Sequence, residues 1–254
     1  MNKTNWERWS AATGYLVVAL GVAAAAFERG APPANAAAEE SLAFFAAYRS
    51  ELRAQSLLFV LSAGAYLWWF GSLRSFLLRA EGETGRLTTV AFGAGVGWAV
   101  LQMVLQSVQV ALATGANGDL TPALAGMLGD LTYVLSVIAY APVAVMLAAV
   151  AVVSLRTGIF PAWLGWLSAL VAAANLVMSL GIVVDSGPLL PGGAFTYVLY
   201  ALMPIWLVAV TTVMVVRLGQ PVSTQAPPTP RSNSHTRPGH GPPDAYLRKG
   251  RQRL

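Results

Sequence analysis

The 254-residue chain is 56% hydrophobic and only 11% charged, whereas a soluble domain usually carries about a quarter charged residues. This composition excludes an ordinary soluble domain, and the absence of cysteine excludes disulfides and thiolate sites. The net charge of +5 lies mostly beside apolar blocks and near the C-terminus, which is not the pattern of a nucleic-acid-binding face.

The apolar residues occur in blocks of about 18–26, the length with which a helix crosses a hydrocarbon layer of about 30 Å. Each block should be a helix, because backbone amides in lipid must be hydrogen-bonded within the segment. The predicted spans are about residues 10–27, 55–78, 88–113, 131–154, 161–184 and 194–217. The fold class is therefore all-α: a polytopic transmembrane six-helix bundle with an outer amphipathic segment and a disordered C-terminal tail.

The first span, about residues 10–27, has two interpretations. Lys3 and Arg8 precede an apolar core, and the later "ANAAA" resembles the small-residue cleavage site of a secretory signal. The apolar stretch is long and rich in alanine, which favours retention as a membrane anchor.

The connection 28–54 contains "EESLAFFAAYRSELR" at residues 39–53, which places Leu42, Phe45, Tyr48 and Leu52 at helical spacing. This pattern is typical of an amphipathic helix on the outer surface or capping the bundle. The alternative is that the segment extends the second span outward.

Orientation follows from the cations beside the spans. Thirteen of the sixteen Lys and Arg residues fall on one side, and only Arg29, Arg49 and Arg53 fall on the other. Because cytoplasmic loops carry the excess of Lys and Arg, both termini should be cytoplasmic. The six-span transmembrane domain is then residues 1–218.

Residues 219–254 form the tail, which contains seven prolines and both histidines. This composition predicts a disordered, basic, Pro-rich cytoplasmic segment. Its end, "AYLRKGRQRL", could contact anionic lipid, or the tail could be a solvated segment that helps to set the topology.

The third span carries three amides in "LQMVLQSVQV", residues 101–110: Gln102, Gln106 and Gln109. At 100° per residue they share a stripe about 60° wide. An amide in lipid without a partner costs roughly 2–7 kcal/mol, so the stripe should face other helices or a wet cavity.

Other polar residues are expected at similar depth in the outer half of the bundle. Two interpretations follow: hydrogen bonds that hold helices together, or a small outward-facing polar pocket with Arg53 and Asp130 at its charged rim. The candidate ligand-binding residues are Gln102, Gln106, Gln109, Asn175, Asp130, Tyr133 and Arg53; their predicted polar neighbours include Gln55, Ser56 and Ser179.

Two further features concern helix shape. Pro142 and Pro204 each remove a helical hydrogen bond inside a span and should bend it. Gly93 and Gly97 in "FGAGVGW" have the four-residue spacing that permits close helix approach.

The usual catalytic patterns are missing from the sequence. It contains no H-E-x-x-H pair, no G-x-S-x-G elbow and no Walker loop. No charged residue lies in the middle of a predicted span, which argues against proton-coupled transport. We expect no catalytic residues, no metal site, no cofactor and no nucleic-acid partner.

The segment "SLRTGIFPAWLGWLSAL", residues 154–170, carries a turn from Gly158 through Pro161 to Trp163 and Leu164. With this turn and the segment 78–82, the chain resembles uncharacterised six-span membrane proteins of high-GC bacteria, similar to the class called domain of unknown function 4386. The resemblance implies a six-span fold in a bacterial membrane, and no activity.

Together these patterns predict a multi-pass protein of the bacterial inner membrane. We expect a non-enzymatic binding, sensing or accessory role with a small outward-facing polar pocket. The alternative is a channel or facilitator for a small neutral solute, which would use the glutamine stripe and the kinks at Pro142 and Pro204.

Overall fold

The structure is a computed structural model that describes residues 3–220 except 28, 31, 33–35, 83, 185, 186, 188 and 190–192. Residues 1–220 form one compact unit. The predictions for the tail, including its disorder, its two histidines and its lipid contact, lie outside the described residues beyond Gln220.

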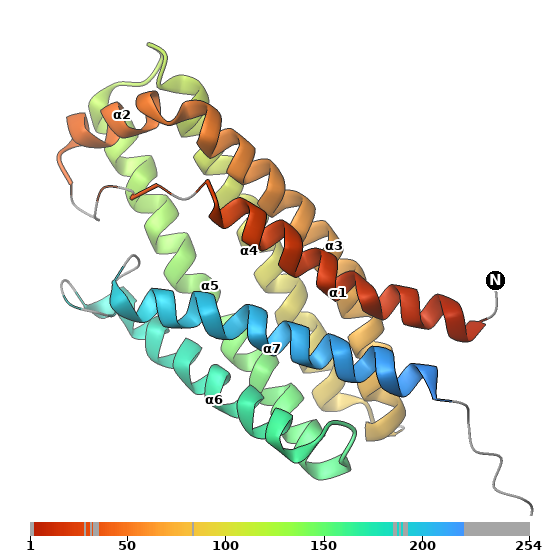
Figure 1. The fold of residues 1–254 in the computed structure, drawn as a ribbon. Coiled ribbons are helices and arrows are strands. Elements are labelled where there is room, and N and C mark those ends of the chain that lie inside the picture. Colours follow the sequence, from red (N-terminus) through yellow and green to blue (C-terminus); the bar gives the residue numbers. More distant parts are fainter. Residues whose placement is uncertain are drawn as a thin grey trace, which may run out of the picture. The chain divides into compact units, whose positions relative to one another are not determined.

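The described residues form helices and no strand (Figure 1). The helices are α1 (Lys3–Ala25), α2 (Ala38–Ala47), α3 (Arg49–Glu81), α4 (Arg86–Gly115), α5 (Pro122–Thr157), α6 (Ala162–Met178), the 3₁₀ helix η1 (Ser179–Val183) and α7 (Ala194–Gly219).

Within the described part of the chain, six helices are long and apolar enough to cross a membrane: Asn5–Ala25, Arg49–Glu81, Arg86–Gly115, Pro122–Thr157, Ala162–Val183 and Phe195–Gly219. This confirms the prediction of an all-α chain with six apolar helices of spanning length. Many large apolar side chains on these helices are exposed, among them Leu57, Leu61 and Leu170. Such a surface suits lipid rather than water, and the six helices suggest a multi-pass membrane protein.

Several helices extend beyond their predicted spans. At 1.5 Å per residue, α3 and α5 are about 50 and 54 Å long, which exceeds a hydrocarbon core of about 30 Å. Hydropathy marks only the apolar part of a helix, and local capping sets its end. α5 begins early because Pro122 suits a first turn and the Thr121 side chain accepts a hydrogen bond from the Leu124 N–H at 3.4 Å.

The turn between α3 and α4 is held by one carboxylate. Glu81 accepts hydrogen bonds from the backbone N–H groups of Leu87 and Thr88, each at 2.8 Å, and from the Thr88 hydroxyl at 2.6 Å. It therefore satisfies N–H groups that the first turn of α4 leaves without intrahelical partners. Gly82 and Gly85 adopt positive φ angles of 81° and 48°, which lets the chain reverse within a few residues.

Each of the six spanning-length helices except the last packs against the spanning-length helix that follows it in the sequence. α3 packs on α1 and α4, α5 packs on α4 and α6, and α7 closes a ring by packing between α6 and α1 (Figure 1). α1 is thus in contact with two other helices, and its Ala11, Val17 and Ala24 are buried.

The main core lies among these helices and is rich in large side chains. Tyr66, Trp69 and Phe70 of α3 form edge or tilted ring contacts with one another, and Trp69 also meets Trp206 of α7 at 6.0 Å between ring centroids. Trp206 donates a hydrogen bond to the Ser168 hydroxyl of α6 at 2.8 Å. Aromatic packing and buried hydrogen bonds therefore join α3, α6 and α7.

The connection 28–54 combines the two predicted alternatives. α2 is a separate amphipathic helix, and after a break at Tyr48 the chain continues into α3, which extends the second span. α2 packs mainly on α5, and its Phe45 joins Leu52, Leu112, Ala113 and Ala125 in a second apolar cluster. We call the end of the bundle that α2 covers the α2 end.

Of the three glycines in "FGAGVGW", the one in close contact with a neighbouring helix is Gly95 rather than the spaced pair Gly93 and Gly97. A Cβ added at Gly93 or Gly97 would meet nothing within 4 Å, whereas one at Gly95 would lie 2.1 Å from the Phe70 ring. Gly93 and Gly97 face away from the neighbouring helices. The close approach of α4 to α3 depends instead on Gly95.

Candidate binding site

Gln109 joins α4 to α3 near the α2 end. Its amide Nε2 lies 3.0 Å from Gln55 Oε1, 3.1 Å from Ser56 Oγ and 3.3 Å from the Leu52 carbonyl. Gln55 is 4% exposed and Ser56 is 1% exposed. Because one NH₂ group serves three buried acceptors, this amide holds two helices together, as the structural interpretation of the stripe requires.

Gln106 lies one turn deeper on the same face of α4 and is 3% exposed. Its Oε1 is buried and accepts no hydrogen bond within the described residues. Buried amide oxygens nearly always have a donor. Gln102, the deepest of the three glutamines, is half-buried. The stripe therefore faces the protein, but its members differ: Gln109 is bonded and Gln106 lacks a donor.

Asn175 lies apart from the glutamines. It is buried in α6, and its Nδ2 donates to the Val171 carbonyl of the same helix at 2.8 Å. α4 and α6 both pack on α5 and are not among the helix pairs in extensive contact. Ser179, a predicted neighbour, donates to the Asn175 carbonyl at 3.1 Å.

The predicted charged rim is not joined. Arg53 and Asp130 are both exposed, and no ion pair links them in the part of the chain that the structure describes. The ion pair found there joins Arg79 of α3 to Glu7 of α1 at 2.7 Å, at the other end of the bundle. Tyr133, half-buried on α5, accepts a hydrogen bond from the Ser136 hydroxyl at its backbone carbonyl.

An open cavity of about 390 Å³ lies where α2 meets α3, and Arg53 is one of its lining residues. The others are Ala46, Ala47, Arg49 and Ser50. Arg49 Nε is buried and finds no acceptor within the described residues. Ser50 donates to Glu51 at 2.8 Å, and Arg29 is near enough to Glu51 to interact electrostatically. Of the three cations on this side, Arg49 and Arg53 line the cavity, and Arg29 interacts with Glu51.

Arg49 and Ser50 did not figure among the predicted site residues. Arg49 precedes Arg53 by four positions, so the two guanidinium groups share one helix face. This spacing was readable in the sequence. What could not be read was the break at Tyr48 that turns α2 across the end of α3.

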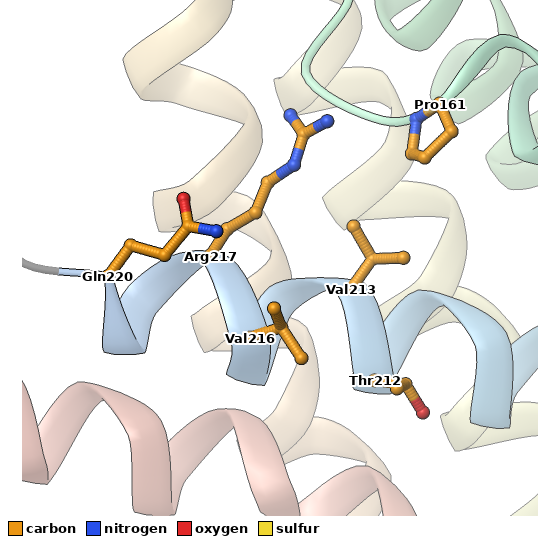
Figure 2. Close-up of a pocket in the computed structure, with 6 residues that line it drawn as sticks. All are labelled: Pro161, Thr212, Val213, Val216, Arg217 and Gln220. Atoms are coloured by element: carbon orange, nitrogen blue, oxygen red, sulfur yellow. The ribbon is translucent and has the colours of Figure 1, made fainter.

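A second open cavity, of about 550 Å³, lies at the opposite end of the bundle (Figure 2). It is lined by Pro161, Thr212, Val213, Val216, Arg217 and Gln220. Arg217 and Val213 project from α7 toward the turn that carries Pro161 (Figure 2). Arg217 Nη1 donates to the Gly158 carbonyl at 3.2 Å and to that of Ile159, so it ties α7 to the turn between α5 and α6.

Comparisons of the chain with protein-family models, with curated proteins and with solved structures find no match. The interpretation of both cavities therefore rests on their own residues. Among the described residues, no group of three or more His, Cys, Asp or Glu side chains could hold a metal ion. The first cavity instead presents two guanidinium groups, whose preferred ligands are carboxylates and phosphates.

Proposed function

We propose that this chain is a multi-pass protein of the bacterial inner membrane with a binding, sensing or accessory role, and that it takes a small polar ligand in the cavity at its α2 end. The observation that carries the proposal is the cavity of about 390 Å³ lined by Arg49, Ser50 and Arg53, in which the buried Arg49 Nε has no acceptor among the described residues. A carboxylate or phosphate would supply one.

The positions of the other polar groups support a ligand site at the same end of the bundle. The hydrogen-bonded set of Gln55, Ser56 and Gln109 follows the cavity along α3. Gln106, with its unpartnered oxygen, lies one turn below. Toward the other end, the interior consists mainly of large apolar or aromatic side chains such as Trp69, Phe70 and Trp206, and its buried polar groups are small hydroxyls such as those of Ser168 and Thr211. This gradient favours a pocket that closes within the bundle.

The alternative is a channel or facilitator for a small neutral solute. It would need a polar path past the main core, where Tyr66, Phe70, Met146 and Leu147 are all at most 2% exposed. Pro142 and Pro204, both inside helices, are the residues at which a bend could open such a path. We therefore rank the channel second.

The ligand proposal is tested by analysing small molecules that co-purify with the protein. The variants are Arg49→Gln/Arg53→Gln in the cavity and Gln102→Leu/Gln106→Leu in the stripe, with Arg86→Gln, an exposed arginine at the opposite end, as the matched control. We expect an anionic compound in extracts of the wild type and of Arg86→Gln, and its loss from the Arg49→Gln/Arg53→Gln variant. Identical extracts from all four proteins would contradict the proposal; loss only from the glutamine variant would move the ligand to the stripe.

The proposed orientation is tested by labelling single cysteines, which the cysteine-free chain makes simple. Asn117, in the exposed turn between α4 and α5, lies at the α2 end, and exposed Thr84 lies in the opposite turn. An impermeant thiol reagent added to intact cells should label Asn117→Cys and leave Thr84→Cys unlabelled until the membrane is opened. The reverse pattern would overturn the topology.

A further inference from the structure

Arg217 carries a charge that the described residues do not neutralise. Its Nη1 donates to the carbonyls of Gly158 and Ile159, and no described carboxylate forms an ion pair with it. The donors at Nε and Nη2 remain for another acceptor. Arg217 lies in the last turn of α7, where a cation also interacts favourably with the helix C-terminus.

The cavity beside Arg217 has two kinds of lining. Val213, Val216 and Pro161 supply apolar surface, and Thr212, Gln220 and Arg217 supply polar groups. The Gln220 side chain lies beside that of Arg217 (Figure 2). An occupant that matches both halves has an anionic group with hydrogen-bond acceptors and a hydrocarbon part. Free phosphate would leave the apolar half uncovered.

The position along α7 agrees with such an occupant. Phe195–Gly219 is one of the six helices of spanning length, so its last turn falls at the level of lipid headgroups. A Cβ at Gly219 would lie 3.0 Å from the Arg8 guanidinium carbon, which places a second cation at the end of α7. Clustered cations at this level attract anionic lipid, each contributing about 1 kcal/mol.

We infer that this cavity is a docking site for one anionic phospholipid, with its phosphodiester on Arg217 and Gln220 and an acyl chain along Val213 and Val216. The competing occupant is the chain's own segment after Gln220. Residues 221–254 carry six Lys or Arg and a single Asp. The positive charge of Arg217 repels a segment with this excess of cations. This site is separate from the cavity at the α2 end, and the lipid proposed here does not depend on the ligand proposed there.

The first test measures lipid retention by native mass spectrometry of the full chain, with phosphatidylglycerol and phosphatidylcholine as probes. Wild type should retain phosphatidylglycerol in preference, and Arg217→Gln should lower that retention about five-fold, the effect of one headgroup-level cation. Arg156→Gln is the matched control, because Arg156 is likewise exposed in the last turn of its helix but does not line the cavity. Equal retention of the two lipids, or equal losses in both variants, would overturn the inference.

A second test leaves Arg217 unchanged, because its two carbonyl bonds also hold the turn between α5 and α6. A photo-crosslinking amino acid replaces Val216, which is 55% exposed, and in a separate protein Ile205, which is 57% exposed on the same helix. In vesicles that contain phosphatidylglycerol and phosphatidylcholine, position 216 should give mainly phosphatidylglycerol adducts, and position 205 should react with both lipids. Crosslinks from position 216 to residues 221–254 would show that the tail occupies the cavity, and the inference would fall.

Discussion

Gly14→Ala should destabilise the protein by about 1–3 kcal/mol, the usual cost of overpacking a filled core. A Cβ at this position would lie 2.1 Å from Thr211 Oγ1 and 2.7 Å from Trp69 Nε1. Gly14 is therefore where α1 touches both α3 and α7. Thr211 and Trp69 are fully buried, which limits the space into which their side chains can move. Neither Thr211 Oγ1 nor Trp69 Nε1 has a hydrogen-bond partner within the described residues.

The loss is measured as the shift in unfolding free energy in detergent mixtures, with Gly21→Ala as the control. Gly21 lies on the same helix, but a Cβ there would meet nothing within 4 Å. That variant should keep wild-type stability or gain slightly, because alanine suits a helix better than glycine. Adding Thr211→Ala to Gly14→Ala should recover part of the loss by removing the nearest atom. Equal stabilities for Gly14→Ala and Gly21→Ala would refute the close contact.

Gln109→Leu should destabilise the protein and Gln106→Leu should not, although both residues belong to one stripe. Leucine at 109 removes the donor shared by Gln55, Ser56 and the Leu52 carbonyl, and leaving such groups buried costs about 1–3 kcal/mol. Leucine at 106 removes an oxygen that has no donor. That substitution should be neutral or stabilising, since an apolar side chain of similar size fills the same space.

Both variants are compared with wild type by thermal unfolding of the purified protein. The double variant should show nearly the sum of the single effects, because Gln106 does not take part in the hydrogen bonds of Gln109. A loss at Gln106→Leu as large as that at Gln109→Leu would show that Gln106 has a bound partner in the membrane. The result would then favour a ligand on the stripe over a purely structural role.

Much of the fold could be predicted because lipid imposes simple rules on a sequence. The apolar blocks marked all six long helices, since each must satisfy its own backbone and be long enough to span the bilayer. The extent of α5 could not be read in this way, because its first turn is capped by Thr121 and the helix packs on α2, and hydropathy reports neither. The break at Tyr48 had no clear signal in the sequence.

The candidate site shows where periodicity stops being informative. A stripe calculated at 100° per residue gave the direction of Gln106 and Gln109 toward the protein, and the structure buries Gln106. Periodicity says nothing about which helices are neighbours, so Asn175 was grouped with the glutamines although α5 separates α6 from α4. Arg53 was selected for its charge beside the bundle, and it lines the cavity together with Arg49 and Ser50.

The closure of the helix ring by α1 and α7 has a consequence for biosynthesis. α1 and α7 pack against each other although they lie far apart in the sequence, so the ring stays open until α7 has been synthesised. Until then Gly14 and the face of α3 that carries Trp69 lack the neighbours that α7 provides. Docking of α7 is therefore the step that covers these surfaces and closes the ring.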